Sequence, residues 1–198
     1  MRSELTNMGN HRVRAAEIQN AIMWNTLVEH KHPLLKTKME PFDFDNPPTD
    51  PEILFANMSQ MMLEKKGVGL SANQVGLPYR MFVMGGHPKI EDGKVRYIFN
   101  PLVNDVSEET IVFKEGCLSF PFLFLLINRP KWVSVRYTNE NSEEVEETLH
   151  GMAARIFQHE NEHMNGYLFT DLVSKFKLDR AKKAQKKLIK ETIRKRNG

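Results

Sequence analysis

The feature that most constrains the fold of this chain is the pattern His-Glu-x-x-His, which runs from His159 to His163 with Glu160 second. Residues four apart lie one turn above each other on an α-helix, so the pattern predicts a helix in this segment. On that helix both imidazoles can reach one metal ion while Glu160 lies beside it. The apolar positions of residues 151–165 and the glycine at Gly166 agree with a helix that ends in a glycine cap. The alternative is a polar helical face that happens to carry two histidines.

A hydrolytic metal site needs three protein ligands and one open position. No histidine follows His163, and the acids beyond it are Asp171, Asp179 and Glu191. Upstream stands Cys117, the one cysteine of the chain, which by default would be a small buried apolar residue. The residues alone therefore leave the third ligand open.

The rest of the chain separates helices from strands. A helix is expected from Pro51 to near Gly67, because its apolar positions recur at helical spacing and Asp50 is a good N-cap before a proline. Short β-type runs follow at residues 80–84, 95–103, 110–114 and 131–137. This order predicts an α+β fold, with short antiparallel or mixed sheets around a central helix that carries the His-Glu-x-x-His pattern. Little regular structure is expected before Pro51.

Length and composition indicate one domain with a tail. The chain has 198 residues, of which 40% are hydrophobic. We expect an N-terminal extension at residues 1–30, the main domain at 31–173 and a basic C-terminal helix at 174–198. The longest apolar run, Phe120 to Ile127, is shorter than the roughly 20 residues of a membrane span and predicts a buried strand, or else an apolar wall. A single cysteine favours a reducing cytoplasm. A transit peptide at the N-terminus is a poorer alternative. We expect a monomer.

Three segments in this order resemble the peptide deformylases: GVGLSANQVG (67–76), EGCLSFP (115–121) and QHENEHMNGYLFTD (158–171). The resemblance extends from about His32 to about Asp171. It implies metal-dependent hydrolysis of the N-formyl group from the initiator methionine of nascent polypeptides. The source of the chain, bacterial, organellar or viral, stays open.

The resemblance also implies roles for single residues. Cys117, His159 and His163 match the metal ligands, and Glu160 matches the general acid and base. The side chain of Gln74 and the backbone N–H of Leu118 match the two donors to the formyl oxygen.

The implied cofactor is one divalent ion, with ferrous iron expected and zinc, nickel or cobalt able to occupy the same ligands. Water held by such an ion is acidified enough to supply hydroxide near neutral pH. Glu160 would take its proton, and Gln74 and Leu118 would stabilise the oxyanion.

Substrate contacts follow from the same resemblance. The backbone of Gly67, Val68 and Gly69 falls where the family holds the substrate peptide as an added strand. Val68 also falls, with Met152 and Arg155, where the family's pocket receives the methionine side chain.

The sequence departs from the family at two positions near these motifs. Glu162 stands where aspartate is usual, and Ser71 stands where alanine is commoner. Two rival functions remain open. One is an endopeptidase of the His-Glu-x-x-His type, and the other is a protein whose metal only braces the fold. Glu160 argues against the second, because a structural site closes its fourth position and needs no base.

The C-terminal segment is strongly basic. Residues 174–196 carry eleven lysines and arginines against Asp179 and Glu191, as the printed sequence shows. Apolar residues recur among them at roughly helical spacing: Phe176, Ala181, Ala184, Leu188 and Ile189. The pattern predicts an amphipathic helix that rests on the domain. The resemblance adds docking of its basic face on ribosomal RNA, through contacts that weaken with salt.

Overall fold

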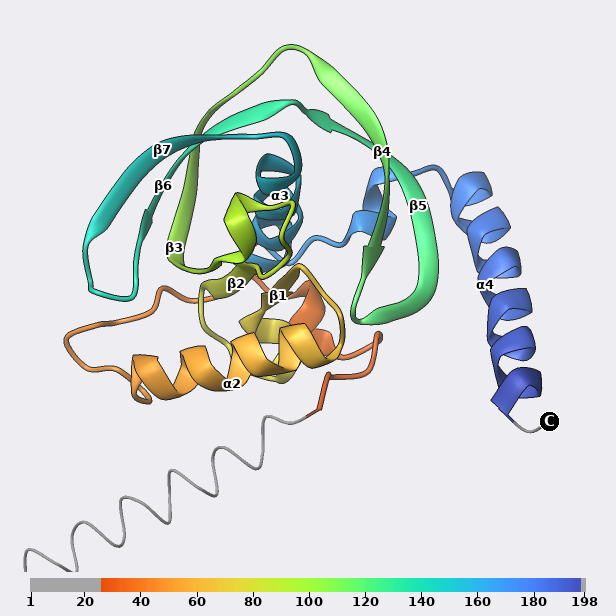
Figure 1. Ribbon diagram of the computed structural model, residues 1–198, viewed down its shortest axis with the longest axis horizontal. Coiled ribbons are helices and arrows are strands. Elements are labelled where there is room, and N and C mark those ends of the chain that lie inside the picture. Colours follow the sequence, from red (N-terminus) through yellow and green to blue (C-terminus); the bar gives the residue numbers. More distant parts are fainter. Residues whose placement is uncertain (1–25, 197–198) are drawn as a thin grey trace, which may run out of the picture.

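The computed structural model describes residues 26–196 and shows an α+β architecture (Figure 1). Three helices carry the labels α2 (Pro51–Glu64), α3 (Gly151–Met164) and α4 (Lys175–Arg196). The strands are β1 (Gly69–Ser71), β2 (Met81–Gly85), β3 (Val95–Val106), β4 (Thr110–Cys117), β5 (Phe120–Pro130), β6 (Trp132–Thr138) and β7 (Glu144–His150). The predicted α+β class is thus confirmed. Before α2, the described residues form one short 3-10 helix, Pro33–Lys36, and an isolated β-bridge from Glu40 to Tyr79.

Two antiparallel sheets build the molecule. The larger has the strand order β1-β2-β3-β6-β7, and the smaller is the hairpin β4-β5. All four β-type runs of the sequence form strands, but β1 and β7 were not predicted. Strand β1 has three residues and lies in what reads as a glycine-rich turn, whereas β7 is an acidic edge strand paired only with β6.

Helix α2 covers one face of the large sheet. The Asp50 carboxylate accepts a hydrogen bond from the Glu52 N–H, so the predicted N-cap is present. Leu54, Met58 and Met62 are buried in a core that also contains residues of β1, β2 and β3. The helix ends at Glu64, before the predicted Gly67.

Helix α3 lies between the large sheet and the hairpin (Figure 1). Phe157 packs edge-on against Phe82 of β2, with ring centroids 5.3 Å apart. Beyond the helix, Gly166 has φ +75°, and a Cβ there would lie 2.8 Å from the backbone oxygen of Lys36. This close approach requires glycine. The Arg80 guanidinium donates to the Met164 carbonyl and holds this end of α3 against the sheet.

Strand β5 corrects one expectation. The run Phe120 to Ile127 was predicted as a buried strand, or else an apolar wall, and only its alternate side chains, such as Leu123, Leu125 and Ile127, are buried. Phe122 and Phe124 are exposed, because a two-stranded sheet has a second face that no other described element covers.

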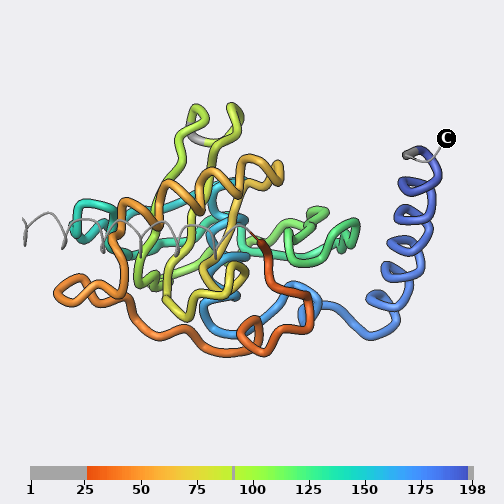
Figure 2. Tube along the Cα trace, turned by 90° about the horizontal axis from the view of Figure 1, so that it is seen from below, coloured from red at the N-terminus to blue at the C-terminus, as the bar shows by residue number. Residues whose placement is uncertain are grey.

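The predicted C-terminal helix is confirmed, and Figure 2 shows α4 standing at the edge of the molecule. Its contacts with the domain differ from the expected stripe. Leu178 and Ala181 pack on the core under β5, and Gln185 donates to the Pro121 carbonyl over 2.7 Å. Phe176 and Leu188 are exposed instead. None of the described helices is long and apolar enough to cross a membrane.

Phe157→Ala should lower the free energy of unfolding by about 3–5 kcal/mol, because it leaves a cavity in the core that positions α3. A urea titration measures the loss. The matched control is Phe176→Ala on α4, where the side chain is 77% exposed and the expected change is within about 0.5 kcal/mol. Equal effects of the two substitutions would contradict this packing.

Candidate metal centre

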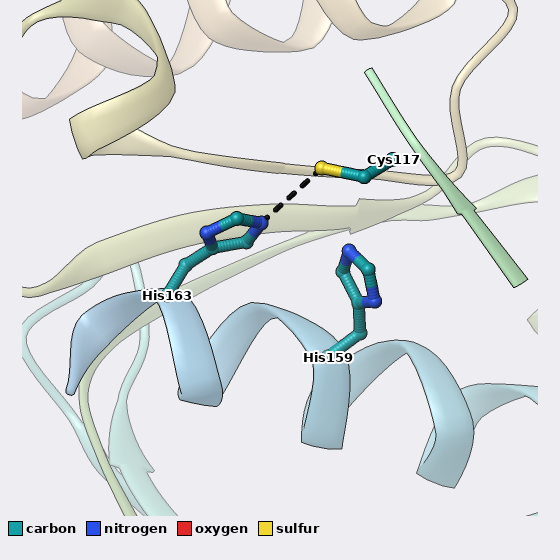
Figure 3. Close-up of side chains that lie close together, drawn as sticks. All are labelled: Cys117, His159 and His163. Atoms are coloured by element: carbon teal, nitrogen blue, oxygen red, sulfur yellow. Dashed lines mark hydrogen bonds between the residues drawn. The ribbon is translucent and has the colours of Figure 1, made fainter. Parts of the chain in front are cut away.

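Three potential metal ligands meet between the hairpin and α3. Cys117 ends β4, and His159 and His163 project from successive turns of α3 toward it (Figure 3). Their ligand atoms all lie within 4.8 Å of one another, and Cys117 Sγ is 3.4 Å from His163 Nε2. Each residue offers one soft or borderline donor atom, a set that suits zinc, iron or another transition metal.

This cluster fits one metal ion. Ligand bonds of about 2.0–2.3 Å place tetrahedral ligand atoms on the order of 3.5 Å apart. The separation of Cys117 and His163 already has this value, and the ligand atom of His159 lies within 4.8 Å of both. The structure brings together the three predicted ligands and no fourth His, Cys, Asp or Glu in the described part of the chain.

His159 is oriented by a buried carboxylate. Its Nδ1 lies 3.2 Å from Glu115 Oε2, so the other ring nitrogen faces Cys117 and His163. Metal-ligating histidines commonly pair their second nitrogen with a carboxylate, which fixes the ring and raises its basicity. Glu115 therefore belongs to the site, although it does not reach the ligand cluster.

Two arginines hold this carboxylate. Arg129 of β5 donates to Glu115 through Nε at 2.7 Å and through a terminal nitrogen at 2.9 Å. Arg155 of α3 donates to the same carboxylate at 2.5 Å and to the backbone carbonyls of Ile111 and Ile127. The pKa of Glu115 falls to about 2, because the hydrogen bonds and charges of His159 and Arg129 outweigh the effect of burial, which alone would raise it.

Glu162 extends the same network. Arg129 donates to both of its carboxylate oxygens, at 2.6 and 3.0 Å. Glu162 thus lies two contacts from Glu115, through Arg129, and three contacts from His159. The longer glutamate still reaches Arg129 from the position at which the family usually has aspartate.

The two histidines have different environments. Burial lowers the pKa of His159, but hydrogen bonds to Cys117 and Glu115 outweigh it, so the pKa is raised well above its usual value. For His163, burial and the charges of His159 and Arg129 lower the pKa well below its usual value. The two rings therefore differ in how readily they hold a proton.

Glu160 lies beside the cluster and faces β1. It is 4% exposed, and its Oε2 has no hydrogen-bond partner among the described residues. Burial raises the pKa of its carboxyl to about 7. A Cβ at Gly69 would lie 2.3 Å from Glu160 Oε1, so glycine is required where β1 passes this carboxylate.

The Gln74 side chain points into the same space. Its Nε2 lies 3.3 Å from Cys117 Sγ and 3.0 Å from Ser119 Oγ, and its Oε1 accepts from the backbone N–H and the hydroxyl of Ser71. Ser71, unlike the commoner alanine, therefore helps to fix the direction of this amide. The Leu118 N–H lies in the turn after β4. Apart from the strand pairings, it donates no backbone hydrogen bond to a described residue.

A cavity of about 880 Å³ opens onto this cluster. Its lining includes all the substrate contacts expected from the sequence: Gly67, Val68, Gly69, Met152 and Arg155. The guanidinium of Arg155 is engaged by Glu115, so its remaining surface, rather than a free charge, faces the cavity. Residues of the N-terminal segment also reach it, since Leu27 lines the cavity and Val28 N–H donates to the Gln74 carbonyl.

Sequence reasoning overlooked Glu115, Arg129 and Ser119. Glu115 and Ser119 belong to the segment EGCLSFP but received no role, and Arg129 closes an apolar strand at a position that alternation assigns to the buried face. A charged residue on the buried side of a strand is the one signal that could have indicated a buried ion pair.

Comparisons with known proteins agree on one family. A family model described as polypeptide deformylase matches residues 24–179. The peptide deformylase of Thermotoga petrophila is 43% identical over 143 residues, which cover 72% of this chain and 82% of that protein. The peptide deformylase of Maricaulis maris is 38% identical over 162 residues, which cover 82% and 92%.

Solved structures give the same result. The crystal structure of a peptide deformylase from Legionella pneumophila superposes with a TM-score of 0.74 at 27% identity, covering 85% of this chain and 97% of that one. A peptide deformylase from Ehrlichia chaffeensis superposes with a TM-score of 0.71 at 33% identity, covering 84% and 98%.

Cys117→Ser should greatly weaken metal binding, because a hydroxyl replaces the thiolate while both histidines remain. Metal content after dialysis, measured by mass spectrometry, checks this. Glu160→Gln is the matched control, since it alters a buried neighbour of the cluster without removing a ligand. A Cys117→Ser protein that holds metal at full stoichiometry would show that the thiolate is not a ligand.

Proposed function

Since this chain belongs to the polypeptide deformylase family, and is therefore a hydrolase acting on the formyl amide, we propose that its cluster of Cys117, His159 and His163 serves the deformylation of formylmethionine at the start of nascent polypeptides. The observation that carries the proposal is an incomplete ligand set beside a buried carboxyl group. Three ligands leave one position for water, and Glu160 stands next to it without a partner for one oxygen.

The metal ligands in this proposal are Cys117 Sγ, His163 Nε2 and the Nε2 of His159. One divalent ion is expected there, with ferrous iron first and zinc, nickel or cobalt as substitutes. Such an ion supplies Lewis acidity and lowers the pKa of water. Glu115 supports the site by keeping His159 turned toward the other two ligands.

Glu160 carries the protons. Its carboxylate accepts a proton from the attacking water and then donates it to the amine that leaves as the C–N bond of the formyl amide breaks. Its burial supports this role, since bulk water does not compete for the carboxyl group. Gly69 lets the carboxyl lie directly against the backbone of β1.

Two donors stabilise the oxyanion that forms on the formyl oxygen. Gln74 Nε2 points toward Cys117, and the Leu118 N–H lies next to that residue in the chain. Loss of one such donor typically costs about 100- to 1,000-fold in rate. Ser71 supports the first donor because its N–H donates to Gln74 Oε1 and its hydroxyl lies 2.9 Å from the same oxygen, which leaves Nε2 directed toward Cys117.

The substrate peptide is proposed to lie along β1. Within its sheet β1 pairs only with β2, so its other edge is open to an added strand near Gly67, Val68 and Gly69. The methionine side chain would enter the cavity beside Met152 and Arg155 of α3. The cavity is lined mainly by apolar groups in this region, which suits a thioether side chain.

A role for α4 on the ribosome is a separate proposal. Its lysines at positions 182, 183 and 186 are exposed, while Leu178 and Ala181 rest on the domain. The basic face is therefore free to meet phosphates, and a cytoplasmic monomer that acts beside the nascent-chain exit is the setting we expect.

Glu160→Gln should abolish more than about 99% of turnover on formyl-Met-Ala-Ser while metal content stays unchanged, because the ligands remain and the proton carrier is lost. Release of formate and metal stoichiometry are the two measurements. A joint loss of metal and activity would instead make Glu160 a ligand or a folding residue.

The control for the activity is a parallel assay of the metal-loaded wild type on casein and on formyl-Gly-Ala-Ser. Deformylation of the methionine peptide without proteolysis supports the proposed function. Cleavage of casein would favour the endopeptidase, and absence of any hydrolysis would favour a metal that only braces the fold.

The double substitution of Lys182→Glu with Lys186→Glu should reduce co-sedimentation with ribosomes at low salt several-fold, because phosphate contacts are electrostatic. Hydrolysis of formyl-Met-Ala-Ser should not change. Lys89→Glu, at an exposed site outside α4, is the control. Ribosome binding that is unchanged in the double variant would reject the role of α4.

A further inference from the structure

Three exposed lysines from two different elements line the cavity, and the part that they line is called its mouth. Lys65 and Lys66 follow the last turn of α2, and Lys114 lies on β4. All three are exposed and line the cavity. None of them forms an ion pair with another described residue.

The acids of the cavity do not neutralise this mouth. Glu115 and Glu160 are the two acidic lining residues, and both are buried at the inner end. Glu115 is already paired with Arg129 and Arg155. Among the described lining residues, the outer part of the cavity is therefore left with uncompensated positive charge.

The chain direction relates the lysines to the reacting centre. Gly69 lies against Glu160, and from there the backbone runs through Gly67 to Lys66 and Lys65. On β4, Lys114 stands three residues before Cys117, which in a strand is about 10 Å away. With its formyl group at Cys117 and its chain following β1 from Gly69 toward Lys66, a peptide would bring its second and third residues near these lysines.

The wall that carries Lys114 also has an apolar part. The ammonium of Lys114 lies 4.7 Å from the ring centroid of Phe124, and Phe122 and Phe124 both line the cavity. The cation–π contact holds the ammonium at the cavity edge. The helix dipole of α2 attracts cations to its C-terminal end, which would account for the positions of Lys65 and Lys66. It does not account for Lys114, which lies on a strand.

We propose that Lys65, Lys66 and Lys114 determine specificity, and that they select formyl-methionine peptides with acidic residues at the second and third positions. The proposal rests on the proposed function, because it presumes that the formyl group is bound at the metal cluster. At an exposed mouth, complementary charge mainly speeds the association of the peptide and forms weak ion pairs. The preference is therefore modest and depends on salt.

The test compares three peptides of equal length on the metal-loaded, full-length protein: formyl-Met-Glu-Glu-Ala, formyl-Met-Gln-Gln-Ala and formyl-Met-Lys-Lys-Ala. The glutamine peptide matches the glutamate peptide in shape and lacks its charge. At low ionic strength kcat/KM should be about 3- to 10-fold higher for the glutamate peptide than for the glutamine peptide, and lowest for the lysine peptide. The difference should shrink at high salt.

Charge reversal at the mouth should invert this order. Lys65→Glu combined with Lys66→Glu should favour the lysine peptide, and Lys114→Glu should act in the same direction. Lys66 has φ +56°, and glutamate keeps the β-carbon already accommodated there, so the substitution adds no new backbone strain. Lys89→Glu changes the net charge as much as Lys114→Glu does, at a site outside the cavity lining, and should leave the order as it is in the wild type.

The outcomes separate the two proposals. Equal kcat/KM for the three peptides, or an order that Lys65→Glu with Lys66→Glu leaves intact, overturns the specificity while deformylase activity stands. Failure of the metal-loaded protein to hydrolyse the neutral glutamine peptide or formyl-Met-Ala-Ser overturns the proposed function, and the specificity falls with it.

Discussion

The buried carboxylate of Glu115 is the interaction on which the site depends. A charge taken out of water is costly unless it is fully paired, and Glu115 meets this requirement through Arg129, Arg155 and His159. These partners come from β5 and α3, so one carboxylate joins the hairpin to the central helix. Breaking such a buried pair typically costs about 3–5 kcal/mol, and here it would also release the ring of His159, a proposed metal ligand.

The site is assembled from parts that are far apart in the chain. Cys117 comes from the hairpin, Gln74 from the short helix after β1, and His159, Glu160 and His163 from α3. Each part is fixed by its own local contact: Ser71 holds the Gln74 amide, Gly69 admits the Glu160 carboxyl, and Glu115 turns His159. The chemistry of formyl-amide hydrolysis therefore relies on backbone fit as much as on the reactive side chains.

Local patterns in the sequence predicted much of this structure. The four-residue spacing of His159 and His163 placed α3, and Asp50 before Pro51 placed the start of α2, because both signals act within one helical turn. The role of Glu115 and Arg129 could not be predicted, since it arises from the pairing of β4 with β5 and their packing on α3. Exposure was misjudged for the same reason: alternation along β5 buries Leu123 but leaves Phe124 open, and nothing local reveals which faces other elements cover.

The central claim is that Cys117, His159 and His163 hold one metal ion with a position left for water. X-ray absorption spectroscopy of the zinc- or iron-loaded protein tests it most directly. The account predicts one sulfur scatterer and two imidazole nitrogens, at about 2.3 and 2.0–2.1 Å for zinc, with the remaining coordination from oxygen. A metal shell without sulfur, or one closed by four protein ligands, would contradict it.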